Sequence, residues 1–282
     1  MPLPDADLHH VATGLAKDTV SKHSAEQPLK LFAGWFCPFV QRAWIALEEK
    51  RIPYQYVEVN PYHKGPDLMR ANPRGLVPTL EVAPGKSLYE SNVLCEYLED
   101  RYPTHKPRLF PVVGQGEDGD FKRARARIWM DYVTSRVIPA FHRLLQFQVQ
   151  DFEGDGEARL DELRAEFRKC LLEFTDEMAE GGPYFFGEDF GIVDLVLLPW
   201  AVRLWVFEEF KGGLRIPELG QGGQNEKTWV RWRTWLDAVS SRDSVKNTTS
   251  DKEHYLPIYK RYADDVAQSE LAKATRAGRG VP

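Results

Sequence analysis

The sequence predicts an α/β domain over residues 28–103, followed by an all-helical domain over residues 120–282. Two observations lead to this prediction. Short β-branched and aromatic segments alternate with helical periods in the first part of the chain, whereas helical periods alone fill the part after Asp120. Residues 104–119 are rich in proline and glycine, and we expect them to be a linker. Residues 1–27 are polar and weakly patterned, which predicts a flexible N-terminal arm.

The first half of the α/β domain has the pattern of a strand, a helix and a second strand. Residues 29–33, LKLFA, are typical of a short strand, and residues 54–59, YQYVEV, of another. Between them, apolar side chains recur at the spacing of one helix face, at Val40, Ala43, Trp44 and Leu47. We therefore expect a helix between two strands.

The second half adds a short helix, a hairpin and a last helix. PDLMRAN predicts the short helix, and the strands PTLEV and SLYE are joined by APGK, in which Pro84 and Gly85 suit a tight turn. ESNVLCEYLEDRYP predicts a helix that ends near Pro103. The order β-α-β-α-β-β-α, with parallel strands followed by a hairpin, is the thioredoxin arrangement.

Composition indicates a soluble protein of a reducing compartment. The chain has 282 residues, a formal net charge of −5 and three cysteines without disulfide-like spacing. The first residues lack the pattern of a signal peptide, and no apolar stretch approaches the roughly 20 residues of a membrane span. We expect a cytoplasmic protein with no membrane and no nucleic-acid partner.

Three further motifs do not predict function. GQGEDG at residues 114–119 matches a dinucleotide fingerprint, but a proline-containing segment precedes it and two acidic residues would repel a pyrophosphate. KRARAR at residues 122–127 spreads its charges around a helix without aromatic residues for base stacking. The seven histidines show no metal-ligand spacing, so we predict no metal.

Cys37 is the candidate catalytic residue. It stands between a strand and a helix, and Pro38 suits the first helical position because its missing N–H is not needed there. A thiolate at a helix N-terminus faces unpaired N–H groups and the positive end of the helix dipole, which lower the pKa of the thiol. Cys95 and Cys170 lie in apolar patterns and predict core positions. Burial as a small apolar residue is the alternative for Cys37 as well.

The surroundings of Cys37 favour one-thiol chemistry with a peptide-like ligand. Val40 stands where a C-x-x-C motif would place a resolving cysteine, so an external thiol must resolve a mixed disulfide. If the Val77–Pro78 bond is cis, the Val77 backbone can pair with such a ligand. Glu90 and Ser91 stand where the last helix begins, and Ser91 could either hold a carboxylate there or simply cap the helix.

Three spaced motifs resemble the glutathione transferases, and in particular their omega class, which has a C-P-F active-site cysteine. These motifs are FCPFVQRAWIAL, NPRGLVPTLE and LYESNVLCEYLEDRYP. In the helical half, PYFFGEDFGIVDLVLLPW resembles the family's helix-start motif, although Gly191 stands three residues before Asp194 where serine or threonine is usual. The resemblance implies a thioredoxin-like N-terminal domain followed by an all-helical C-terminal domain, the glutathione transferase fold, in a homodimer.

The resemblance also implies roles for individual residues. Cys37 would face the glutathione sulfur, and the other glutathione-binding residues would be Phe39, Lys64, Val77, Pro78, Glu90 and Ser91. Val77 would pair with the cysteinyl part, Glu90 and Ser91 would hold the γ-glutamyl end, and Lys64 would hold the glycyl carboxylate. Trp235 would reach the second-substrate pocket, with core packing as the alternative.

These observations predict a glutathione-dependent thiol transferase or reductase that takes glutathione as co-substrate and acts on a small-molecule or protein mixed disulfide. Dehydroascorbate, S-substituted glutathione and glutathionyl-quinones are further candidate substrates. Two alternatives remain open. One is a transferase that conjugates glutathione to electrophiles, and the other is a non-enzymatic member that keeps the fold for binding or regulation.

Overall fold

The computed structural model describes residues 8–112, 114 and 118–282, and it divides into two compact units. The α/β unit comprises the chain up to Arg123 together with Ser240–Tyr255. The helical unit comprises Ala124–Val239 and Leu256–Pro282. Residues 1–7 of the predicted arm and residues 115–117 of the GQGEDG motif lie outside the described residues.

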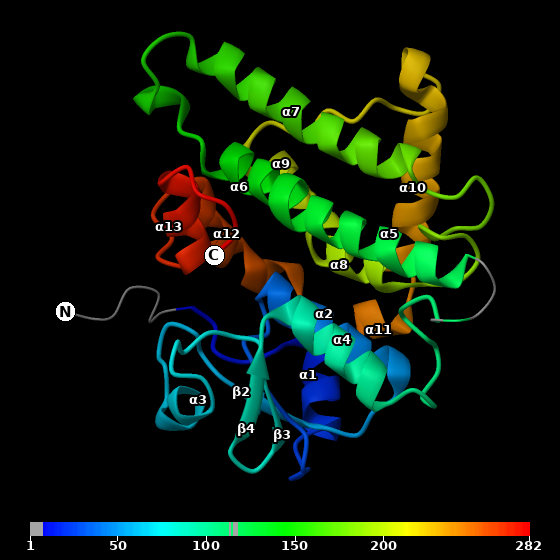
Figure 1. Ribbon diagram of the computed structural model, residues 1–282. Coiled ribbons are helices and arrows are strands. Elements are labelled where there is room, and N and C mark those ends of the chain that lie inside the picture. Colours follow the sequence, from blue (N-terminus) through cyan, green and yellow to red (C-terminus); the bar gives the residue numbers. More distant parts are fainter. Residues whose placement is uncertain (1–7, 113, 115–117) are drawn as a thin grey trace. The chain divides into compact units, whose positions relative to one another are not determined.

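The α/β unit is built on a four-stranded sheet in the order β2-β1-β3-β4. β1 is parallel to β2 and antiparallel to β3, which pairs antiparallel with β4. Helices α2 and α4 lie side by side (Figure 1). This is the thioredoxin-like arrangement that the order of elements predicted. The strands are β1 Lys30–Ala33, β2 Gln55–Glu58, β3 Thr79–Ala83 and β4 Lys86–Tyr89; the helices are α1 Gly14–Lys22, α2 Pro38–Lys50, α3 Pro66–Ala71, α4 Ser91–Arg101 and α11 Asp243–Lys246.

The helical unit contains α6–α9, α13 and most of α5, α10 and α12, which confirms the predicted helical half. A buried carboxylate fixes the start of its most apolar helix, α8. Asp194 accepts hydrogen bonds from the backbone N–H of Phe185 at 2.8 Å, from that of Gly191 at 2.9 Å and from the Trp235 indole at 2.7 Å. Burial raises the pKa of Asp194 to about 6, although the three hydrogen bonds oppose the shift. The bounds are α5 Gly119–Tyr132, α6 Ile138–Gln146, α7 Gly156–Asp176, α8 Ile192–Ala201, α9 Trp205–Phe210, α10 Glu226–Ser240, α12 Lys252–Ala263 and α13 Glu270–Arg276.

Short turns of other helix types complete the helical unit. A π-helical turn, Val133–Val137, separates α5 from α6, and single 3-10 turns cover Val149–Asp151 and Gly223–Asn225.

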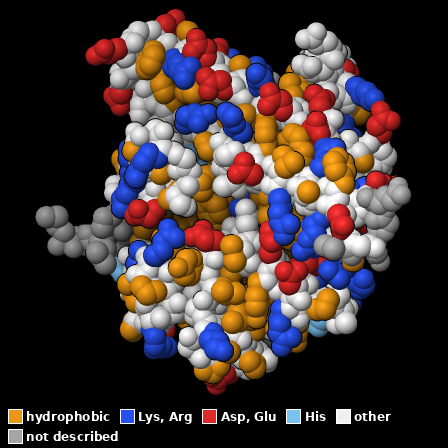
Figure 2. All heavy atoms as spheres, in the orientation of Figure 1, with side chains coloured by type: hydrophobic (Ala, Val, Ile, Leu, Met, Phe, Trp, Pro, Cys, Tyr) orange, Lys and Arg blue, Asp and Glu red, His pale blue; other side chains and the backbone are white. Residues whose placement is uncertain are grey.

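Acidic and basic side chains interleave over α7 (Figure 2), where Arg159 pairs with both Glu162 and Glu166. None of the described helices is both long and apolar enough to cross a membrane.

Part of the predicted N-terminal arm is ordered structure. Residues 14–22 form α1, and the segment on each side of it is bound to the sheet region. The Trp35 indole donates to the carbonyl of His9 at 3.0 Å, and the Tyr56 N–H donates to the carbonyl of His23 at 2.8 Å. The sequence prediction missed this helix because α1 buries only Ala16 and Thr19, which is too few apolar positions for a helical pattern.

Residues 240–255 belong to the α/β unit, although the sequence prediction assigned them to the helical domain. Polar side chains of α2 hold this returning segment. The Arg242 guanidinium donates to both Glu49 oxygens at 2.6 Å, and the Gln41 amide donates to Thr248 and Thr249. Such pairs join residues about two hundred positions apart, and a local sequence pattern does not reveal them.

A buried ion pair fixes the chain just after α4. The Lys50 ammonium at the end of α2 lies 2.8 Å from the Glu99 carboxylate of α4, and both side chains are fully buried. Lys50 also donates to the carbonyls of His105 and Pro107, while Glu99 accepts from Arg108 and from the Leu109 N–H. The first residues of the predicted linker are therefore bound to the α/β unit. Burial alone would raise the pKa of Glu99, but the bonds from Lys50 and Arg108 bring it below its ordinary value.

We expect Glu99→Gln to lower the free energy of unfolding by about 3–5 kcal/mol, because it leaves the Lys50 ammonium buried without its countercharge. The adjacent variant Asp100→Asn is the control. Asp100 is exposed and pairs with Arg123 at 3.3 Å, so its loss should cost less than about 1 kcal/mol. Urea unfolding at neutral pH measures both. An equal loss of unfolding free energy in the two variants would contradict a stabilising role for the buried Lys50–Glu99 pair.

Candidate functional site

Cys37 occupies the N-cap position of α2, directly after the turn that follows β1, and Pro38 is the first helical residue, as predicted. Its backbone is extended, its N–H donates to the carbonyl of Gly34 at 3.0 Å, and its carbonyl accepts from the Gln41 N–H at 3.1 Å. The side chain is half-buried. Cys37 therefore lies at the positive end of the α2 dipole. Most residues of this helix are buried, which holds the helix in place.

The sheet brings the segment before β3 to the same edge as Cys37. Phe32 of β1 pairs with Thr79 of antiparallel β3, so the end of β1 adjoins the start of β3. The Val77–Pro78 bond is cis, which the sequence analysis required for a backbone site. Asn72, fully buried and not identified from the sequence, supports this segment: its amide donates to Thr79 Oγ1 at 3.0 Å and to the carbonyl of Leu76 at 3.3 Å.

Helix α4 begins at Glu90 and Ser91, as predicted. Glu90, not Ser91, is the N-cap residue, and Ser91 is the first helical residue. Glu90 has a φ of +71°, in the left-handed region that non-glycine residues rarely adopt, and its side chain is exposed. Of the two roles that the sequence left open for Ser91, the structure therefore excludes the helix cap. Its hydroxyl instead accepts a hydrogen bond from the Arg42 guanidinium at 3.2 Å.

Arg42 joins the Cys37 helix to the start of α4. Its guanidinium is buried and donates to Ser91 Oγ and to Asn92 Oδ1, each at 3.2 Å. It also lies 5.3 Å from the centroid of the Phe39 ring, in a cation–π contact. Burial lowers the pKa of Arg42 to about 9, and electrostatic interactions with Cys95 and Cys37 oppose that shift. The sequence analysis missed Arg42, although a charged residue on the apolar side of a helix is a usable signal.

Arg74 joins two of the other predicted residues. Its guanidinium lies 2.7 Å from the Glu90 carboxylate, and its backbone carbonyl accepts a hydrogen bond from the Lys64 ammonium at 3.1 Å. Lys64, Arg74 and Glu90 thus form a polar chain on the surface of the α/β unit. Arg74 was also not identified from the sequence, since its role depends on a partner 16 positions away.

The two other cysteines and Trp235 lie away from the Cys37 site. Cys95 is fully buried, and burial raises the pKa of its thiol to about 12; burial also raises the pKa of Cys170. Trp235 is fully buried in the helical unit, where it bonds Asp194 and packs against Phe174. Its assignment to a second-substrate pocket was therefore wrong, because the indole fills the core and fixes the start of α8.

One group of potential metal ligands lies elsewhere in the described chain. The ligand atoms of Asp251, Glu253 and His254 lie within 4.8 Å of one another. The two carboxylates are exposed and the imidazole is half-exposed. Such a solvated cluster is common without an ion, so we assign it no role.

Two family models match the chain. The N-terminal domain of glutathione S-transferase matches residues 36–101, and the C-terminal domain of the same family matches residues 157–238. The glutathione S-transferase omega-1 of Sus scrofa is 32% identical over 180 residues, which cover 64% of this chain and 68% of that protein.

Solved structures agree with the family models. The glutathione transferase Omega 3C of Trametes versicolor has a TM-score of 0.76 and 44% identity over 92% of this chain and all of that chain. A rice glutathione transferase solved in complex with glutathione has a TM-score of 0.70 and 26% identity, over 86% of this chain and all of that chain.

We expect iodoacetamide to alkylate Cys37 in the folded protein and to leave Cys95 unmodified from neutral to mildly alkaline pH. The Cys95 thiol is buried, and with a pKa of about 12 it stays protonated throughout that range. Peptide mapping by mass spectrometry measures the modification of each thiol against time, with unfolded protein as the control in which all three cysteines react. Equal rates at Cys37 and Cys95 in the folded protein would contradict this placement.

Proposed function

The chain belongs to the glutathione transferase family, and from that premise we propose that it is a glutathione-dependent thiol transferase acting through the single thiol of Cys37. The observation that carries the proposal is the position of Cys37 at the N-cap of α2. A conjugating transferase would need a tyrosine or serine hydroxyl in this position to activate glutathione, and the neighbours of Cys37 are Phe36 and Pro38.

The proposed reaction has two thiol–disulfide exchanges. The Cys37 thiolate attacks the glutathione sulfur of a mixed disulfide, so that a Cys37–glutathione bond forms and the substrate leaves as a thiolate, which takes a proton from water. The thiolate of a second glutathione then attacks the glutathione sulfur held on Cys37. This step forms glutathione disulfide and restores the Cys37 thiolate. The helix terminus stabilises the thiolate at the start and at the end of the cycle.

We place glutathione along the edge that Cys37 shares with Val77. In this placement the Val77 backbone pairs with the cysteinyl part, with Pro78 behind it and Phe39 beside the thiol. Glu90 and Ser91 hold the γ-glutamyl end, and Lys64 holds the glycyl carboxylate. Lys64 already donates to the Arg74 carbonyl, and its ammonium has two further protons for a carboxylate. The rice relative was solved in complex with glutathione, which supports glutathione as a ligand of this chain.

Reduction of dehydroascorbate, of S-substituted glutathione or of glutathionyl-quinones would use the same thiolate. A cytoplasmic homodimer with a role in detoxification is the setting we propose. The second candidate function is conjugation of glutathione to electrophiles. It is favoured by the range of relatives, which includes the rice enzyme as well as proteins named omega. A non-enzymatic binding role is the third, and no observation favours it.

We expect Cys37→Ser to lower the rate of reduction of the mixed disulfide of glutathione and 2-mercaptoethanol by about 100-fold or more, since it removes the nucleophile. Cys170→Ser is the matched control and should keep the wild-type rate. The assay follows glutathione disulfide with glutathione reductase. Retained activity in Cys37→Ser would contradict the mechanism, and a wild type that conjugates an aryl halide but reduces no disulfide would favour the conjugating alternative.

A further inference from the structure

The turn that carries Cys37 is held by three other segments of the α/β unit. Gly34–Cys37 is a β-turn, closed by the hydrogen bond from the Cys37 N–H to the Gly34 carbonyl at 3.0 Å. Trp35 and Phe36 are the two central residues of this turn, and both side chains are buried. The position of Cys37 at the start of α2 therefore depends on what holds these two side chains.

Two of the three segments hold the turn through aromatic packing. Phe36 stacks on Tyr62, in the loop after β2, with ring centroids 6.0 Å apart and planes 9° apart. Trp35 packs edge-on against Tyr255, where the returning segment ends, with centroids 4.8 Å apart. These contacts bury the rings, and the polar edge of the Trp35 indole is held by the third segment.

The third segment is residues 8–23, which we call the N-terminal strap. Its His9 carbonyl accepts a hydrogen bond from the Trp35 indole at 3.0 Å, and the His9 ring lies edge-on to the indole with centroids 6.3 Å apart. A buried indole N–H needs an acceptor, because burial removes the water that would otherwise bond it. The strap supplies this acceptor from its backbone, so the bond depends on the path of the strap.

The first part of the strap is bound to β2 and to the returning segment. The Ala12 N–H donates to the Glu58 carboxylate of β2, and Ala12 itself is buried. The Thr13 N–H donates to Ser250 Oγ at 3.1 Å, and the Thr13 hydroxyl accepts from the Asp251 N–H at 3.0 Å. These bonds fix the backbone of the strap within a few residues of the carbonyl that Trp35 requires.

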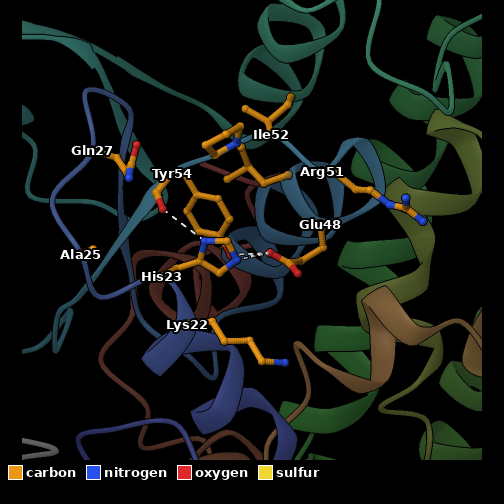
Figure 3. Close-up of a pocket in the computed structure, with 10 residues that line it drawn as sticks. Lys22, His23, Ala25, Gln27, Glu48, Arg51, Ile52 and Tyr54 are labelled. Carbon is orange, nitrogen blue, oxygen red and sulfur yellow. Dashed lines mark hydrogen bonds and ion pairs between the residues drawn. The ribbon is translucent and has the colours of Figure 1, made fainter.

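The far end of the strap is anchored at His23, just after α1. The His23 ring stacks on Tyr54 with centroids 3.9 Å apart and planes 18° apart, and its Nε2 lies 3.1 Å from the Glu48 carboxylate (Figure 3). The His23 carbonyl accepts from the Tyr56 N–H at 2.8 Å. Glu48 lies near the end of α2. The strap is therefore bound at Trp35, before the Cys37 helix begins, and again at Glu48, close to where that helix ends.

We propose that the N-terminal strap positions the turn that carries Cys37, and that Trp35 is the positioning residue through which it acts. The inference rests on the proposed role of Cys37 as the reactive thiol. In the closed turn the Cys37 N–H is bonded and Cys37 is the N-cap of α2, where a thiolate gains from the helix dipole. A turn released from the strap lets the thiol leave this position, and the fraction of thiolate at neutral pH falls.

The first test changes the turn. Trp35→Phe keeps an aromatic ring against Tyr255 and removes the indole N–H. Trp44→Phe is the matched control, because the Trp44 indole is also buried and donates to Tyr54 at 2.7 Å. We expect Trp35→Phe to slow the alkylation of Cys37 by iodoacetamide at neutral pH by about threefold, since a helix N-terminus stabilises an anion by roughly that factor. Trp44→Phe should keep the wild-type rate.

The second test changes the strap and leaves the turn intact. Leu8 is 4% exposed, so the carboxylate of Leu8→Asp forces this end of the strap away from the unit. Val11→Asp is the control, because it places the same charge on the same segment at a side chain that is 48% exposed. We expect Leu8→Asp to slow the alkylation of Cys37 at least as much as Trp35→Phe does, and Val11→Asp to leave the rate unchanged.

Two readouts distinguish positioning from a general loss of stability. At strongly alkaline pH the Cys37 thiol is ionised in every variant, so the alkylation rates should converge. Arg42 and Tyr56 interact electrostatically with Cys37 and are unchanged in all of the variants. Hydrogen exchange followed by mass spectrometry should show the strap amides exchanging roughly threefold to tenfold faster in Trp35→Phe, because that variant loses one hydrogen bond to the strap.

The proposal is overturned by a wild-type alkylation rate in Trp35→Phe or Leu8→Asp, by an equal loss in either control, or by a difference that persists at strongly alkaline pH. Alkylation needs no glutathione, so this result does not depend on whether the chain reduces disulfides. A chain that passes the test but reduces no mixed disulfide would keep the positioning role of the strap and overturn the proposed thiol transfer.

Discussion

The burial of α2 is the constraint on which the rest of the α/β unit depends. Most of this helix is inaccessible to water, including the polar residues Gln41, Arg42 and Lys50. A buried polar or charged group is costly unless it is bonded, so each of these residues requires a partner from another segment. Arg42 fixes the start of α4, Lys50 its end, and Gln41 the returning segment at Thr248. The helix thereby organises the segments around it.

The burial of α2 also holds Cys37 in position at the start of the helix. A cysteine at a helix N-terminus gains from the dipole only while the thiol stays on the axis of an intact helix. Three sets of buried bonds along α2 keep that axis fixed, and the sheet register sets the cis Val77–Pro78 segment beside it. The residues that we propose for glutathione binding on α4 and on the segment before β3 then need no direct contact with Cys37. Arg42 connects α2 to α4 through the interior, and Asn72 supports the segment before β3.

The sequence predicted the features that local patterns encode. The strands, the start of α2 at Pro38 and the start of α8 around Asp194 follow from short-range periodicity and capping chemistry. The sequence analysis missed residues whose role depends on a partner far away in the sequence. Arg42 and Ser91 are 49 positions apart, and Arg242 and Glu49 are 193 apart. Trp235 was assigned to a pocket from the resemblance alone, and its full burial and its bond to Asp194 place it in the core instead.

The central claim is that Cys37 forms a covalent mixed disulfide with glutathione. Intact mass after incubation with glutathione disulfide, on the wild type and on Cys37→Ser, tests it most directly. The account predicts a single glutathione adduct on the wild type that dithiothreitol removes and that the serine variant lacks. A wild type without an adduct, or an equal adduct on Cys37→Ser, would contradict it.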